Sequence, residues 1–249
     1  MSEVLVSEAK FGLETAINTH LSDMHKPAFM KILDEMLRTG APAAASSSRH
    51  GAFKGGLVAH VYDLWSISRR MSACMIDVLE LSISDVREKS GCNQDKIRQQ
   101  ISNLAPDSVL KVCLLHDLNK VASINGDPHY IDNVLNSGAI STQKPWKSNP
   151  EAATIPSVNK ALRLASFEDH PIARLLAGPS TRIRDGQASL ALAVKLVPEI
   201  ESMLTEAEVE AVIYHDGAYP GRDDGIMSVS SCLQMVIHLA DMASAHFLC

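Results

Sequence analysis

An adjacent histidine and aspartate, His116 and Asp117, close an apolar run near the middle of the chain. An imidazole beside a carboxylate is a good ligand pair for a divalent transition metal, and a partly buried carboxylate is costly unless it is paired or binds a cation. On a helix, Lys120 would share their side and could hold a phosphate oxygen against that metal. The dipeptide alone favours a plainer interpretation, a buried histidine with one hydrogen bond beside an aspartate at a helix end. The remaining ligands must therefore come from elsewhere in the chain.

Asp241 is a second acidic candidate for a buried site. It lies within an almost wholly apolar stretch that predicts a helix over residues 229–247. An unpaired carboxylate there would be expensive, so it needs a cation or a hydrogen-bond donor. An arginine or the end of a neighbouring helix would also meet that need. His238 lies one turn earlier on the same side of the predicted helix.

His60 borders the apolar face of a predicted helix over residues 57–81. Two adjacent glycines, Gly55 and Gly56, precede this helix and predict a tight turn into it. Taken alone, His60 is better explained as a core histidine capped by a neighbouring group than as a ligand.

Three separated motifs together resemble the HD-domain superfamily of metal-dependent phosphohydrolases, whose pattern is a histidine, a later His–Asp pair and a distant aspartate. The resemblance covers roughly residues 50–247 and depends on these motifs: Gly55-Gly56-Leu57-Val58-Ala59-His60, His116-Asp117-Leu118-Asn119-Lys120 and His238-Leu239-Ala240-Asp241. It implies one divalent metal (Mn, Fe, Co, Ni, Zn or Mg) held by four ligands: His60, His116, Asp117 and Asp241.

The resemblance also implies roles for the residues around that metal. The metal would polarise a phosphoryl oxygen and lower the pKa of bound water, giving a nucleophile near neutral pH. Asp117 and Lys120 would lie at the reaction centre, with Lys120 stabilising charge that develops on the phosphate. His215 matches a histidine that many relatives carry late in the fold. There it could face the phosphate, act as a general acid or support a ligand.

Asp185 marks a departure from the family pattern. Many relatives carry a His-Gly-Glu type sequence where this chain has Arg184-Asp185-Gly186, and the histidine of those relatives can help to bind a second metal. The replacement favours one metal and makes Asp185 a candidate substrate-binding residue. Asn119 stands where many relatives have glycine, and asparagine tolerates the left-handed backbone conformation, so we expect little consequence.

A long segment rich in proline and glycine, residues 123–157, follows the His–Asp motif. Such a loop inside a compact domain is usually a lid, a binding loop or disordered. Lys144 and Trp146 are candidate substrate-binding residues, because an aromatic ring with a nearby lysine suits stacking on a base and holding a phosphate. An ordinary surface anchor explains the same residues equally well.

The composition limits the partners that we expect. The chain has 249 residues, of which 46% are hydrophobic, and a net charge of -6. An acidic chain is a poor general binder of nucleic acid, since phosphate contacts need clustered Lys and Arg, so we expect a small phosphorylated substrate, a nucleotide. The five cysteines form no CxxC pair, and no signal pattern or membrane-spanning apolar stretch is visible. We therefore expect a soluble protein of the reducing cytoplasm with no membrane partner.

Helical periodicity predicts an all-α fold, an HD-domain helical bundle with a long lid-like loop. We expect residues 1–48 to form an N-terminal helical extension packed on the core, and residues 49–249 to form an HD-type phosphohydrolase domain. The central helix is expected to use Asp107 as its N-cap and to continue to Val121, while Thr205 opens a predicted capping box. No strand of useful length is predicted, and further helices are expected over residues 4–38, 158–178 and 188–197.

These features favour an enzyme, a metal-dependent phosphohydrolase acting on a nucleotide or deoxynucleotide. One alternative is a phosphodiesterase, either a 3′–5′ exonuclease on short oligonucleotides or a cyclic-nucleotide hydrolase. Another is a catalytically silent binding module with the same fold. A wholly structural explanation requires Asp117 and Asp241 to be buried for other reasons.

Overall fold

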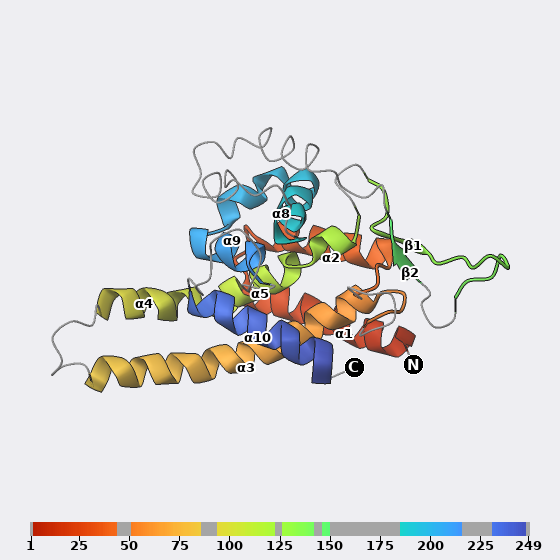
Figure 1. Ribbon diagram of the computed structural model, residues 1–249. Coiled ribbons are helices and arrows are strands. Elements are labelled where there is room, and N and C mark those ends of the chain that lie inside the picture. Colours follow the sequence, from red (N-terminus) through yellow and green to blue (C-terminus); the bar gives the residue numbers. More distant parts are fainter. Residues whose placement is uncertain are drawn as a thin grey trace, which may run out of the picture.

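The computed structural model of the chain describes residues 2–43, 51–85, 94–122, 126–141, 146–149, 185–215 and 231–247 (Figure 1). Helices dominate these residues, as the hydrophobic periodicity predicts. The helix expected over residues 158–178 lies outside the described residues. Among the helices of the described part, none is both long and apolar enough to cross a membrane.

Two N-terminal helices, α1 (Ser2–His20) and α2 (Lys26–Thr39), lie where the sequence predicts them. Their apolar side chains join one continuous core with α3 (Gly56–Asp85) and α5 (Pro106–Leu115). Phe11 on α1 is apolar and yet 72% exposed. The buried face of α1 consists of residues spaced by three or four positions, which places Phe11 on the opposite side: Ala9, Leu13, Ala16 and Ile17.

The start of α3 depends on two glycines. Gly55 has a positive φ of 80°, which a residue with a side chain rarely adopts. A Cβ on Gly56 would lie 2.0 Å from the carbonyl oxygen of Gly51. This close turn starts the helix four residues before His60 and so fixes the position of the imidazole along the axis of α3.

The second half of α3 extends beyond the bundle. Buried side chains in α3 end at Ser72, and the rest of the helix runs outward with α4 (Gln94–Asn103) beside it (Figure 1). Buried side chains of α3 thus lie between Gly56 and Ser72, and farther along the helix partly buried side chains such as Met75 and Leu79 pack against the core.

The central helix α5 differs from the prediction at both ends. Its N-cap is Ala105 rather than Asp107, because Pro106 occupies the first turn, where its missing N–H needs no cap. The helix ends at Leu115, before the His–Asp pair, and a short 3₁₀ turn, η2 (Leu118–Lys120), follows. His116 and Asp117 therefore lie at a helix end.

The described residues from 185 onward form four helical elements, the last of which packs along α3: α8 (Asp185–Leu196), η4 (Pro198–Met203), α9 (Glu206–Ile213) and α10 (Cys232–Phe247). The predicted capping box at the start of α9 is confirmed. The Thr205 hydroxyl accepts from the Glu208 N–H, and the Glu208 carboxylate accepts from the Thr205 N–H.

A short two-stranded antiparallel sheet is present, although the sequence predicts no strand of useful length. The strands are β1 (Tyr130–Asp132) and β2 (Trp146–Ser148), and Tyr130 pairs with Ser148. Three residues are too few to show an alternating pattern, so periodicity could not have found them. The two strands form a ribbon that projects from the body (Figure 1).

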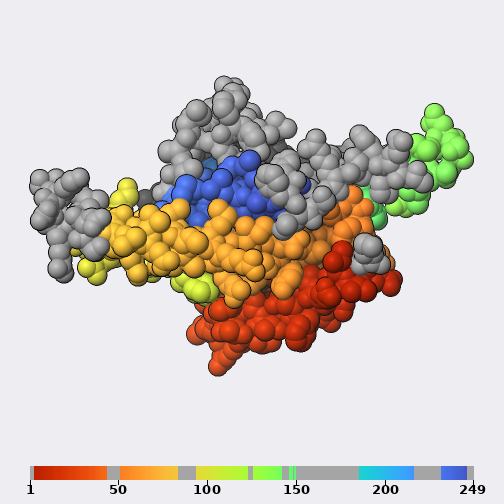
Figure 2. All heavy atoms as spheres, turned by 90° about the horizontal axis from the view of Figure 1, so that it is seen from below, coloured from red at the N-terminus to blue at the C-terminus, as the bar shows by residue number. Residues whose placement is uncertain are grey.

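The helix α3 lies between the N-terminal helices and α10. Figure 2 shows the N-terminal residues along one side of α3 and α10 along another, and both pairs of helices are in contact. The helix α5 contacts α1, α2, α3, α8, α9 and α10, and all of its residues from Ser108 to its C-terminal end at Leu115 are buried. That end carries the His–Asp pair.

Candidate metal centre

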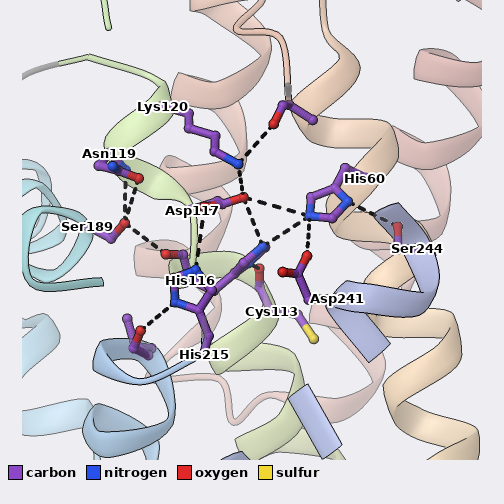
Figure 3. A network of polar contacts seen from close by, with 12 residues as sticks. His60, Cys113, His116, Asp117, Asn119, Lys120, Ser189, His215, Asp241 and Ser244 are labelled. Atoms are coloured by element: carbon purple, nitrogen blue, oxygen red, sulfur yellow. Dashed lines mark hydrogen bonds and ion pairs between the residues drawn. The ribbon is translucent and has the colours of Figure 1, made fainter. Parts of the chain in front are cut away.

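Three side chains from distant parts of the sequence meet at the end of α5. They are His60 from α3, His116 from the end of α5, and Asp241 from α10, and one potential ligand atom of each lies within 4.8 Å of the others. His60 Nε2 lies 3.2 Å from His116 Nε2 and 3.1 Å from Asp241 Oδ1. This cluster could hold a metal ion (Figure 3).

The chemistry of these donors fits a divalent metal. His116 Nδ1 donates to the Cys113 carbonyl at 2.8 Å, so the neutral ring keeps a lone pair on Nε2. That lone pair faces His60 Nε2 and lies close to the Asp241 carboxylate. Basic groups this close together need a cation or a proton between them.

Asp117 lies between the two histidines and a lysine (Figure 3). Its Oδ2 atom is 3.3 Å from His116 Nε2 and 3.8 Å from His60 Nε2, and the same atom accepts from the Lys120 ammonium. Its Oδ1 atom is 3.7 Å from His215 Nε2. The fourth expected ligand therefore borders the cluster, and its role as a ligand stays a prediction.

Charges around Asp117 keep it ionised. Burial alone would raise the pKa of this carboxyl, but the nearby Lys120 ammonium and the His116 ring hold its pKa well below the usual range. Burial would lower the pKa of Lys120, and the attraction of Asp117 outweighs it and raises that pKa. The two groups form a buried ion pair beside the candidate metal ligands.

Asp241 is the most exposed member of the cluster. Its side chain is 22% exposed, against 3% for that of His60 and 0% for that of His116. Burial raises the pKa of Asp241, but the hydrogen bond from His60 prevails and places the pKa below its usual range. Of the three clustered side chains, that of Asp241 is therefore the one nearest to solvent.

The N-terminal segment reaches the site through one backbone carbonyl. Lys120 Nζ donates to the Ala43 carbonyl at 2.9 Å in addition to Asp117. Ala43 is held in place because its N–H donates to the Gly51 carbonyl at 2.9 Å. The sequence predicts that residues 1–48 form an extension packed on the core. One of them, Ala43, also positions Lys120 directly through its carbonyl.

Two serines that the sequence did not indicate hold the site residues. Ser189 on α8 donates to the His116 carbonyl at 3.0 Å and accepts from the Asn119 N–H at 3.0 Å, so it fixes the turn that carries Asp117. Ser244 on α10 lies 3.0 Å from His60 Nδ1. Ser244 comes three residues after Asp241, about one helical turn, so the two side chains share one side of α10. This spacing is the only feature of the sequence that could have placed either serine at the site.

His215 lies behind Asp117. Its ring is edge-on to that of His116, with centroids 5.2 Å apart, and its Nδ1 donates to the Val212 carbonyl at 2.7 Å. The His215 side chain is only 2% exposed. His238 Nδ1 donates to the His215 carbonyl at 2.8 Å, which links this end of α9 to α10.

The other expected substrate-binding residues differ in their placement. Asp185 is exposed at the first residue of α8, and Trp146 is half-buried on β2. Lys144 lies outside the described residues. The sequence assigned no role to His129 and Tyr130, yet the charges of Lys120 and Asp117 act on both side chains.

None of the family models, curated proteins or solved structures with which the chain was compared matches it. The resemblance to the HD-domain superfamily therefore stays a prediction.

Proposed function

We propose that the chain is an HD-type metal-dependent phosphohydrolase that acts on a nucleotide or deoxynucleotide. The observation that carries the proposal is the convergence of His60, His116 and Asp241, whose ligand atoms lie within 4.8 Å of one another. Asp117 and Lys120 border that cluster. Imidazole and carboxylate donors together suit several divalent metals, and a buried lysine beside them suits an anionic substrate.

A bound divalent metal would polarise the phosphoryl group and lower the pKa of water at the site. Asp117 is ionised and faces the histidine pair, so it can complete the ligand set with His60, His116 and Asp241. Because Asp241 is the most exposed of the four, the phosphate would enter on its side.

Lys120 is proposed to bind a phosphate oxygen. A lysine ammonium has three N–H groups. Two of those of Lys120 donate to described residues, one to the Asp117 carboxylate and one to the Ala43 carbonyl. The third would stabilise negative charge on the phosphate in the transition state. His215 contacts Asp117 and is buried, so we assign it the positioning of that carboxylate.

The test is a screen for phosphate release from nucleoside mono-, di- and triphosphates with added Mn, Co, Ni or Mg. Asp117→Asn keeps the size of the side chain and should abolish both metal retention and turnover. Asp34→Asn changes an exposed carboxylate on α2 and should leave both unchanged, which makes it the matched control.

Several outcomes would contradict the proposal. Full turnover by a metal-free Asp117→Asn protein would exclude Asp117 from the site. Hydrolysis of cyclic or oligonucleotide diesters to nucleoside monophosphates, with no phosphate release from the nucleotides, would indicate a phosphodiesterase. Metal retention with no release from any substrate would indicate a catalytically silent binding module.

A further inference from the structure

The base of the β1–β2 ribbon is packed onto the body of the protein, whereas its tip is exposed. Tyr130 is 7% exposed, and Val134 nearer the tip is 52% exposed. Two hydrogen bonds from Asn149 fix the base, one from its N–H to the His129 carbonyl and one from its side-chain amide to the Pro128 carbonyl, each 2.9 Å long. Figure 2 shows the ribbon extending away from the bundle.

Tyr130 lies close enough to the candidate metal centre for the charges of Lys120 and Asp117 to act on it. Burial raises its pKa to about 12, and the charges of Lys120, Asp117 and Asp185 also act on its phenol. No hydrogen bond joins the Tyr130 hydroxyl to any residue in the part of the chain that the structure describes. A buried ring thus carries a hydrogen-bonding group near Lys120.

His129 lies beside Tyr130 in the same region. The two rings are nearly perpendicular, with centroids 4.6 Å apart. Burial lowers the pKa of His129, and the charges of Asp185, Lys120 and Asp117 act on it as well. A neutral imidazole can both donate and accept a hydrogen bond, so His129 can contact hydroxyl groups as well as anions.

The strand register places Trp146 on the same face of the ribbon as Tyr130. Tyr130 is opposite Ser148 and Asp132 is opposite Trp146, while the pair between them points to the other face. Diagonal neighbours on one face lie about 7–8 Å apart, within reach of large aromatic rings. Trp146 therefore lies on the same ribbon face as Tyr130, two residue pairs nearer the tip of the ribbon.

We propose that this ribbon face is the nucleoside subsite of the candidate active site. The Trp146 ring stacks on the base, and the Tyr130 hydroxyl and His129 imidazole bind the sugar, whose phosphate lies at Lys120. Every base has a π-face that an aromatic ring can cover, and the order of these groups along the ribbon follows the order of base, sugar and phosphate in a nucleotide. The inference rests on the proposed function, because it takes the phosphate position from it.

Tryptophan fluorescence tests the stacking directly. Trp65 is buried in the core at 5% exposure, so a Trp65→Phe protein reports on Trp146 alone. The protein is first treated with EDTA, which prevents metal-dependent hydrolysis. It is then titrated with AMP, adenosine and ribose 5-phosphate. AMP and adenosine should quench the emission and ribose 5-phosphate should not. Absence of quenching by both base-containing probes would overturn the subsite.

Calorimetric titration with AMP gives an independent measurement in the chain with Trp65 unchanged. Trp146→Leu should weaken AMP binding at least fivefold, as expected for loss of a base-stacking ring. Tyr130→Phe, which keeps the buried ring, should weaken it about threefold through loss of one hydrogen bond. Val134→Ser at the exposed tip of the same ribbon is the control and should bind like the unaltered chain. Unchanged affinity in both Trp146→Leu and Tyr130→Phe would contradict the inference.

The two proposals can fail separately. Phosphate release from nucleotides with unaltered AMP affinity in Trp146→Leu would refute the nucleoside subsite and leave the phosphohydrolase standing. Quenching by adenosine with no phosphate release from any nucleotide would support the subsite and refute the phosphohydrolase.

Discussion

Ser244 determines which nitrogen of His60 faces the centre. If the Nδ1–H of His60 donates to the Ser244 hydroxyl, the Nε2 lone pair faces His116 and Asp241, where a metal could bind. Ser244→Ala should therefore weaken metal binding about 10- to 100-fold, the range found when partners of ligating histidines are removed. Metal affinity measured by calorimetry tests this, and Ser82→Ala, which removes a serine from the outer part of α3, is the control. Equal affinity in Ser244→Ala and Ser82→Ala would contradict the assignment.

Lys120 and a metal would share one atom, Oδ2 of Asp117. Replacing Lys120 with Met removes a positive charge beside the metal, so the protein should retain metal and bind it at least as tightly. Turnover should fall by about 10²-fold, because one stabilising donor for the phosphate is lost. Metal analysis together with a phosphate-release assay separates the two effects. Loss of metal in Lys120→Met would make Lys120 a structural support of Asp117.

Site residues could be predicted from the sequence where a polar side chain lies in an apolar pattern that indicates burial. His60, His116 and Asp241 stood out because each lies in an apolar helical pattern, and the structure brings them together. Ser189 and Ser244 did not, because serine is common on helices and their partners lie 70 to 184 residues away. Such contacts depend on how helices pack, which periodicity does not report.

Two helix ends must meet for the site to form, and a buried ion pair joins those helices. Lys111 on α5 donates to Glu208 on α9 at 3.2 Å, and the two side chains are 5% and 1% exposed. Removing one partner of a buried pair leaves an uncompensated charge. The helix α5 leads to Asp117 and α9 leads to His215, so the pair fixes the relative position of both site residues.

Lys111→Met should lower the free energy of unfolding by about 3–5 kcal/mol. Urea denaturation measures this, with Lys10→Met as the control. Lys10 forms an exposed pair with Glu14 at 3.7 Å, and its loss should cost no more than about 0.5 kcal/mol. Equal stability of the two variants would show that the buried pair does not hold α5 to α9.

Long helices were predicted correctly from the sequence, whereas the ends of helices and the short strands were not. The period of α3 and α10 was clear because each has many buried turns. The end of α5 at Leu115 was missed, because the apolar pattern continues through η2 although the backbone has left the helix. The β1–β2 ribbon was missed because its pairing joins residues 14 to 18 positions apart across a loop.

At the scale of the whole molecule, the metal would tie the chain together. Its expected ligands come from α3, the end of α5 and α10, which all contribute to one core. A metal at 100 times its dissociation constant should stabilise the fold by about 2.7 kcal/mol, raising the melting temperature by about 5–10 °C. Thermal unfolding with and without metal measures the shift. Asp241→Asn should remove it, and an equal shift in that variant would contradict a site at Asp241.

The most direct test of the central claim is the metal content of the purified protein after loading and dialysis, measured by elemental analysis. We predict about one divalent metal per chain, reduced to background in His116→Gln and in Asp241→Asn. No retained metal under any loading condition would contradict the account, because the four residues would then be structural and the enzymatic proposal would fail with them.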